Sequence, residues 1–209
     1  DGLGVTSMDC RQDGAAIDPG CRAGYIMNAG LAAVEQADAL LLIGANPRLE
    51  APVWNARIRK AWLENGLKVG VIGENTDLTY RYSYLGAGTQ TLQEVADGGH
   101  DFAKVLKDAE HPLIVVGQGA LARSDGAAVL ASARALAETY AGGREGFGML
   151  HTAMARVGAL DLGFVPGEDG RDTAGILDGA ANGDVEVVFL LGADEIDPAK
   201  AEGAFVVYQ

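Results

Sequence analysis

The stretch from residue 38 to residue 72 constrains the fold of this 209-residue chain most strongly. An apolar run, Ala39–Ile43, predicts a buried strand, and a sharp turn at residues 44–47 ends it. A helix then starts at Pro52, because apolar residues recur on one helical face: Trp54, Ile58, Ala61 and Trp62. Lys68–Ile72 supplies the next strand. Strand, turn, helix and strand form the repeating unit of doubly wound α/β folds, which bind ligands at the carboxyl ends of their strands.

The same strand pattern recurs along the chain. Short apolar runs that end in glycine and a polar turn occupy residues 39–46, 68–75, 112–119 and 187–194. Such runs are typical of parallel sheets covered on both faces. Helices are expected at 92–109 with a break at Gly98-Gly99, at 127–140 after a Ser124 cap, at 148–159 and at 173–181.

The pattern predicts an α/β protein with two Rossmann-like lobes containing parallel sheets. We place one lobe at residues 1–95 and the other at 96–209, with Thr79–Gly88 as a crossing between them.

Composition narrows the possible partners. A hydrophobic content of 48% supports a sizeable core, and the net charge of −13 argues against a nucleic-acid partner, since phosphate binding requires a basic face. No apolar run approaches the roughly 20 residues that span a bilayer, so we expect no membrane insertion. The chain opens on Asp1-Gly2 without a leader and stops just after an apolar strand, from which we expect a piece of a longer polypeptide.

Residues 117–122 match G-x-G-x-x-A, the turn that binds dinucleotides. Two features favour a simple strand-to-helix turn instead. The best helix start is Ser124 rather than the glycines, and Glu138, the acidic residue about 20 positions on, lies within a helix instead of ending a strand. Nucleotide binding at this turn stays open as the alternative.

Other polar groups favour structural roles. Asp194, Glu195 and Asp197 offer three carboxylates for Mg²⁺, but Asp197-Pro198 is typical of a helix start capped by Asp197. The histidines have no partner at ligand spacing and are expected at the surface or in turns: His100, His111 and His151.

A basic cluster and two cysteines complete the candidate groups. The cluster comprises Arg48, Arg57, Arg59 and Lys60. It can clamp an anion at the Gly44 turn or pair with acidic neighbours at a subunit boundary, and we favour pairing. Cys10 and Cys21 match no zinc or iron–sulfur spacing, and we expect free thiols rather than a disulfide.

Longer segments carry a family resemblance. LLLIGANPRLEAPVWNARIRKAW, LKVGVIGENTDLTYRYSYLG, HPLIVVGQGALARSDGAAVL, ALDLGFVPG, VVFLLGAD and FVVYQ occur in order from about Ala37 to Gln209. Together they resemble the large iron–sulfur subunit of NADH:quinone oxidoreductase (NADH dehydrogenase), respiratory complex I. That family belongs to the molybdopterin oxidoreductase superfamily, and the resemblance implies a fold like domains 2 and 3 of formate dehydrogenase.

The resemblance also implies where a cofactor site has been lost. The superfamily's pterin-binding turns map to Gly44, Asn46 and Pro47, and to Gly73-Glu74-Asn75. The acidic group that contacts a guanine ring in pterin-binding relatives falls at Gly73, which has no side chain. We therefore expect vestigial turns, with no catalytic, cofactor-binding or metal-binding residue in this chain. The 2Fe-2S and 4Fe-4S clusters are expected in the N-terminal part of the full subunit.

The resemblance implies a scaffold in the peripheral arm of complex I, inactive in isolation, within a subunit that relays electrons from NADH toward quinone. Its partners would be other peripheral-arm subunits, on the cytoplasmic face of a bacterial inner membrane or the matrix side in mitochondria. Two alternatives differ in class: a retained pterin- or nucleotide-binding oxidoreductase domain, and a freestanding acidic interaction module.

Overall fold

The computed structural model describes residues 2–209. The chain forms two compact units. The large unit is Ala16–Met154, and the small unit combines Asp1–Ala15 with Ala155–Gln209. The strands on both sides of residue 95 hydrogen-bond in one sheet, so the units do not divide at the expected lobe boundary.

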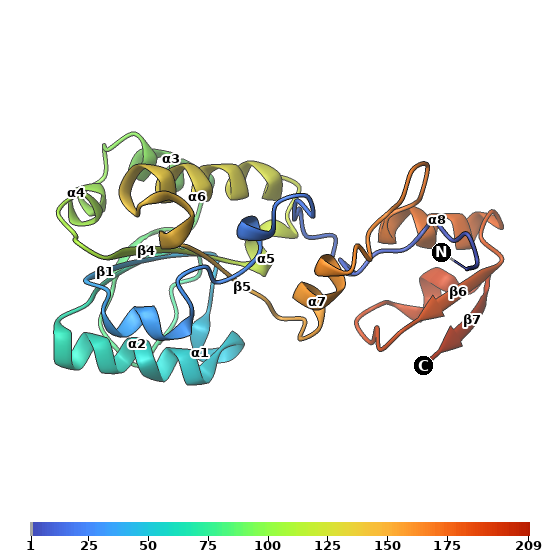
Figure 1. The fold of residues 1–209 in the computed structure, drawn as a ribbon, viewed down its shortest axis with the longest axis horizontal. Coiled ribbons are helices and arrows are strands. Elements are labelled where there is room, and N and C mark those ends of the chain that lie inside the picture. Colours follow the sequence, from blue (N-terminus) through green and yellow to red (C-terminus); the bar gives the residue numbers. More distant parts are fainter. Residues whose placement is uncertain (1) are drawn as a thin grey trace. The chain divides into compact units, whose positions relative to one another are not determined.

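The large unit is built on a parallel sheet with the strand order β3-β2-β1-β4-β5 (Figure 1). Its strands are β1 (Ala39–Ile43), β2 (Lys68–Ile72), β3 (Ser83–Gly86), β4 (Pro112–Gly117) and β5 (Phe147–Leu150). The central strand β1 pairs residue for residue with β2 and with β4, and all its residues are buried. This is the doubly wound α/β arrangement that the apolar runs predict.

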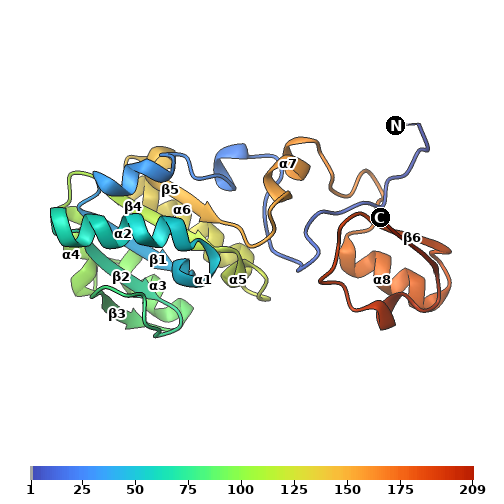
Figure 2. The same ribbon diagram turned by 90° about the horizontal axis from the view of Figure 1, so that it is seen from below.

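Helices cover both faces of this sheet (Figures 1 and 2). On one face lie η2 (Leu31–Glu35), α1 (Pro47–Glu50) and α2 (Pro52–Asn65), and η1 (Arg22–Gly24) contacts β5. On the other lie α3 (Thr89–Ala96), α4 (Asp101–Lys107) and α6 (Gly126–Tyr140). Two short elements flank α6. The helix α5 (Gln118–Leu121) links β4 to α6, and η3 (Gly143–Gly146) links α6 to β5.

The core packs helix side chains directly onto the strands. On the α2 face, Trp54, Ile58 and Ala61 join buried residues of β1 and β2 in one hydrophobic cluster. On the other face the ring of Phe102 lies so close to Gly70 that a Cβ there would sit 2.6 Å from it. Glycine in β2 therefore lets α4 approach the sheet.

The small unit contains a second sheet. The strands β6 (Val187–Leu190) and β7 (Phe205–Tyr208) pair in parallel, and α8 (Thr173–Asn182) packs on β6. The other elements are α7 (Arg156–Asp161) and η4 (Pro198–Ala201). Arg156 is buried and donates to Asp13 at 2.7 Å, which ties the two chain segments of this unit together.

Several expected elements are confirmed and two are wrong. The break at Gly98-Gly99 separates α3 from α4, and α8 starts at Thr173 as expected. Residues 148–159 are not one helix, because Phe147–Leu150 adds to the sheet edge as β5. Thr79–Gly88 is not a crossing between lobes, because Ser83–Gly86 pairs with β2. Short apolar stretches fit a strand and a helix equally well, so periodicity alone does not separate them.

Candidate functional site: the strand-end cavity

Three strands of the large unit end at one edge of the sheet in glycines that lie against each other. Gly44 follows β1, Gly73 follows β2 and Gly117 ends β4. A Cβ on Gly117 would lie 2.2 Å from the carbonyl oxygen of Gly44, and a Cβ on Gly44 would lie 2.4 Å from the Cβ of Ala120. Gly44 also has a φ of +57°, which favours glycine. The strand ends therefore form a floor of closely packed glycine backbone.

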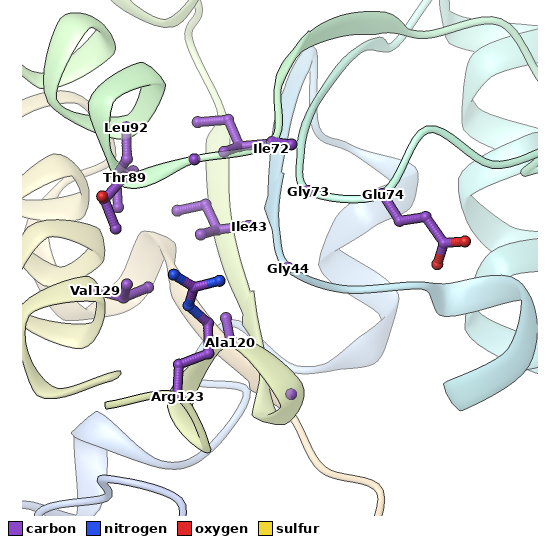
Figure 3. A pocket seen from close by; sticks show the side chains of 13 residues that line it. Ile43, Gly44, Ile72, Gly73, Glu74, Thr89, Leu92, Ala120, Arg123 and Val129 are labelled. Atoms are coloured by element: carbon purple, nitrogen blue, oxygen red, sulfur yellow. The ribbon is translucent and has the colours of Figure 1, made fainter. Parts of the chain in front are cut away.

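A cavity of about 320 Å³ opens over this floor (Figure 3). We call it the strand-end cavity. Its lining is mainly glycine and apolar side chains from the strand ends, α3, α5 and α6. The charged side chains in the lining are Glu74 and Arg123, and Thr89 adds a hydroxyl. The volume lies at the lower end of the range for small-molecule sites.

Three of the four apolar runs described in the sequence end at this edge of the sheet, at Gly44, Gly73 and Gly117. The fourth run does not belong to this sheet, because Gly192 follows β6, which pairs with β7 in the small unit.

Arg123 is the cationic group of the cavity, and sequence reasoning missed it. Its guanidinium extends over the cavity toward Ile43 (Figure 3). It also donates to both carboxylate oxygens of Asp125, at 2.7 and 2.9 Å. Sequence reasoning treated Arg123 as a spacer before a helix at Ser124, whereas α6 begins at Gly126 and α5 follows the turn directly. An arginine just after a strand-end glycine turn was the available signal.

The Arg123–Asp125 pair has an electrostatic consequence. The hydrogen bond from Arg123 lowers the pKa of the Asp125 carboxyl. Asp125 is therefore ionised at neutral pH and offsets the charge of the cation that lines the cavity.

The second turn that the resemblance marks, Gly73-Glu74-Asn75, reaches the cavity through Gly73 and Glu74. Gly73 has no side chain, and the carboxylate of exposed Glu74 lies across Gly44 from Arg123 and points away from it (Figure 3). Asn75 accepts a hydrogen bond from the Tyr82 hydroxyl at 2.7 Å and does not line the cavity. Glu74 is therefore the acidic residue that this turn brings to the cavity lining, and its carboxylate points away from Arg123.

The first turn that the resemblance marks, at Gly44, Asn46 and Pro47, lies only partly at the cavity. Gly44 lines the cavity, whereas Asn46 and Pro47 do not. Pro47 begins α1, as its fixed φ favours. Three polar atoms near this turn are buried and have no hydrogen-bond partner among the residues that the structure describes: Asn46 Oδ1, Glu50 Oε2 and Trp54 Nε1. Burial raises the pKa of Glu50.

The side chains of the basic cluster make their contacts within the large unit. Arg48 pairs with Asp77 at 2.7 Å, and Arg59 donates to the carbonyl of Thr79 at 3.2 Å. Both contacts fix the loop that follows β2. The favoured acidic pairing is therefore seen, but the partners belong to this chain.

The other two members of the cluster reach Glu35 in η2. Arg57 forms a close ion pair with it, and Lys60 lies 2.9 Å from it. The loop after β2 is also held internally, since buried Asn55 donates to the Leu78 carbonyl and accepts from the Tyr80 hydroxyl.

The remaining candidate groups are placed apart from the cavity. Asp197 caps η4 by accepting from the Ala199 amide, as expected. His100 caps α4, and the His151 ring lies 2.6 Å from the Tyr25 carbonyl. Cys10 and Cys21 are free thiols.

Within residues 2–209, no three His, Cys, Asp or Glu side chains gather at a distance suited to a metal ion. In the same residues, no helix is both long and apolar enough to cross a membrane.

The strand-end cavity does not fit a pterin dinucleotide. A tight site needs an acidic group for the base, a positive charge for the phosphates and amides at a helix start. The resemblance places the acidic position at Gly73, which has no side chain. Arg123 is already paired with Asp125, and α5 spans only four residues. The strand-end cavity therefore has room for a ligand but lacks the set of charged groups and helix-start amides that would hold a dinucleotide tightly.

Comparison with known proteins agrees with the family resemblance. A family model described as molybdopterin oxidoreductase matches residues 1–209. The mitochondrial NADH dehydrogenase (ubiquinone) iron-sulfur protein 1 of Solanum tuberosum is 38% identical over 99% of this chain and 27% of its own length. An NADH-quinone oxidoreductase subunit of Rickettsia felis is 40% identical over 99% of this chain and 30% of its own length.

A third relative is the 75 kDa subunit of NADH-ubiquinone oxidoreductase from Reclinomonas americana. It is 39% identical over 90% of this chain and 27% of its own length. The chain thus spans less than a third of the curated relatives that it matches.

Proposed function

The chain belongs to the molybdopterin oxidoreductase family, and on that basis we propose that it is part of the large iron–sulfur subunit of an NADH:quinone oxidoreductase. The observation that carries the proposal is similarity to such subunits along 99% of the chain. The chain serves as a structural scaffold in the peripheral arm of complex I. The 2Fe-2S and 4Fe-4S clusters that relay electrons toward quinone belong to the N-terminal part of the full subunit.

The strand-end cavity of this scaffold holds no cofactor. Support comes from Gly73 at the acidic position and from the pairing of Arg123 with Asp125. The partners are other peripheral-arm subunits, on the cytoplasmic side of a bacterial inner membrane or the matrix side in mitochondria. The purified chain should contain no stoichiometric molybdenum, tungsten or iron in elemental analysis.

A matched pair of glycine substitutions in the full subunit tests the scaffold role. A Cβ at Gly119 meets no described atom within 4 Å, so Gly119→Leu fills the cavity without a clash at the backbone. A Cβ at Gly117 meets the Gly44 carbonyl oxygen at 2.2 Å, so Gly117→Leu disrupts the sheet edge. We expect Gly119→Leu to leave complex assembly and NADH:quinone activity unchanged, and Gly117→Leu to remove the subunit from the complex.

Two results would contradict the proposal. Loss of activity in an intact Gly119→Leu complex would favour the alternative, a retained pterin- or nucleotide-binding domain, and Arg123 is the residue that such a ligand would contact. Failure of the tagged full subunit to co-purify with other complex I subunits would remove the complex I assignment itself.

A further inference from the structure

The outward face of α2 carries a row of apolar side chains. Val53 and Leu63 are 78% and 58% exposed, and Ala56 lies exposed between them along the helix. Their helical spacing places the three residues on one face, opposite the core residues Trp54 and Ile58. We call Val53, Ala56 and Leu63 the outer stripe. Apolar side chains therefore line both faces of α2.

This pattern differs from that of a helix on the other side of the sheet. The helix α3 exposes Gln90, Gln93 and Glu94, which are polar. A surface helix typically has such polar or charged residues opposite its core face. Single exposed apolar residues are common on proteins, but an aligned row of them indicates a surface that another protein covers.

The fold of the large unit is already complete without a layer over the outer stripe. Helices cover both faces of the sheet, and α2 belongs to the outer layer on its side (Figures 1 and 2). Domains are built from two or three such layers around a core. A further layer on α2 therefore belongs to a separate domain or to another chain.

Positive charge borders the outer stripe, although the net charge of the whole chain is −13. Arg57 and Lys60 share the single carboxylate of Glu35, so one of their two charges is not offset. Arg59 donates to a backbone carbonyl, which carries no net charge. Glu64 on the same helix offsets one of the two remaining charges. The border of the stripe therefore keeps a net positive charge, which favours a partner surface with carboxylates at its rim.

We infer that the outer stripe is a docking surface for another peripheral-arm subunit of complex I, one that presents an apolar ridge bordered by carboxylates. The inference rests on the proposed function, which supplies such partners. An apolar centre with a polar rim is the usual composition of a protein interface. Lys60 lies between Ala56 and Leu63 on this face, and its methylene groups continue the apolar surface while its amine reaches Glu35.

A matched pair of alanine substitutions in the full subunit tests the inference. Ala56→Glu puts a carboxylate into the centre of the outer stripe, where it faces the carboxylates of the partner. Ala131→Glu puts one on exposed α6, on the other side of the sheet. Each new side chain has a cation about one helical turn further on, Lys60 or Arg134, so we expect both helices to stay folded.

The tagged Ala56→Glu subunit should recover about tenfold less of the other complex I subunits than the parent does, because a charge is buried at the centre of the interface. The Ala131→Glu subunit should recover as much as the parent. The purified chains of both variants should unfold at the temperature of the parent, which separates lost docking from lost folding.

Carbodiimide cross-linking identifies what covers the outer stripe, because it joins an amine to a carboxylate that it touches. In the purified chain Lys60 should couple to Glu35, which lies 2.9 Å away. In the assembled complex we expect a second link, from Lys60 to an aspartate or glutamate of another subunit, and Ala56→Glu should abolish it. Lys104, exposed on α4, is the control, and its links should be the same in the parent and in Ala56→Glu.

Four results would overturn the inference. Equal recovery of complex I subunits by the two variants would mean that the outer stripe is not a docking surface. A second link from Lys60 to a distant part of the same polypeptide would assign the stripe to another domain of the subunit. Self-association of the purified chain that Ala56→Glu abolishes would assign it to a second copy. If the parent subunit itself does not co-purify with complex I subunits, the proposed function falls, and this inference falls with it.

Discussion

At the scale of single residues, α2 shows how the sequence pattern and the packing agree. Trp54 is 3% exposed and packs in the main cluster of the large unit, whereas Trp62 is only partly buried at its margin. The helical spacing placed both on the buried face but did not distinguish their depth. Depth depends on how η2 and the loop after β2 close over the helix, which periodicity does not encode.

The depth of each tryptophan predicts a difference in stability. Trp54→Ala should lower the free energy of unfolding by about 3–5 kcal/mol, because it removes a large buried side chain and leaves a cavity. Trp62→Ala should cost distinctly less, because part of that ring is already in water. Urea unfolding of the purified chain measures both. Equal losses for the two variants would contradict the burial that we describe.

The raised pKa of Glu50 predicts that the free energy of unfolding depends on pH. Burial raises the pKa of Glu50 in the folded chain, so the folded state binds its proton more tightly than the unfolded state. The stability linked to this group is present below the unfolded pKa and is lost as the pH rises through the folded pKa. Glu50→Gln cannot ionise, so it should be more stable than the parent at pH 8, with the difference shrinking toward pH 4.

Urea unfolding across this pH range checks the prediction, and exposed Glu64→Gln is the matched control. A Glu50→Gln variant less stable than the parent at pH 8 would show that the hydrogen bond from the Asn46 backbone amide to the carboxylate outweighs the cost of burial.

At the scale of elements, the strands were predictable where both faces are buried. The runs ending at Gly44, Gly73 and Gly117 were predicted as strands because continuous apolar residues followed by glycine suit a covered parallel sheet. β3 and β5 were not predicted. β3 is partly exposed at the edge of the sheet, and β5 is a four-residue strand whose sequence also suits a helix.

The candidate site was predictable in position but not in chemistry. The apolar runs that end in glycine gave the place of the cavity at the strand ends. The pairing of Arg123 with Asp125 depends on α5 and on the later start of α6, which cap preferences alone did not give.

The strand-end cavity predicts weak ligand binding. A pterin or adenine dinucleotide at ~1 mM should raise the free energy of unfolding by well under 1 kcal/mol, because a weak ligand stabilises only by RT ln(1 + [L]/Kd). Thermal unfolding with and without each compound measures this. Gly119→Leu, which fills the cavity, is the control for nonspecific effects. A shift equivalent to ~3 kcal/mol that Gly119→Leu abolishes would favour the retained-site alternative.

At the scale of the whole molecule, the small unit depends on both ends of the chain. Asp1–Ala15 and Ala155–Gln209 form it together, and the Asp13–Arg156 ion pair joins them. The Arg156 side chain is fully buried, and its Nε and Nη2 atoms have no hydrogen-bond partner within residues 2–209. Sequence reasoning divided the chain at a single point and could not find a unit assembled from distant segments.

Removing the partner of a buried cation predicts a large local loss of stability. Asp13→Asn should destabilise the small unit by about 3 kcal/mol, because it leaves the buried charge of Arg156 uncompensated. Asp184→Asn is the control, since its pair with Arg171 is 3.3 Å long and exposed, and it should cost well under 1 kcal/mol. Amide exchange along α8 reports the small unit, and exchange along β1 reports the large one. Faster exchange confined to β1 would contradict the assignment of this ion pair.

The glycine floor under the strand-end cavity has a consequence for how such a site loses its ligand. Gly44 and Gly117 touch through backbone atoms, so a side chain at either position breaks the architecture before it alters recognition. Substitutions that preserve the fold can therefore change only the side chains around the cavity, such as Glu74, Arg123 and Asp125. A binding site built on such a floor can therefore lose its ligand contacts through single substitutions around the cavity, because the glycine backbone that shapes the cavity stays unchanged.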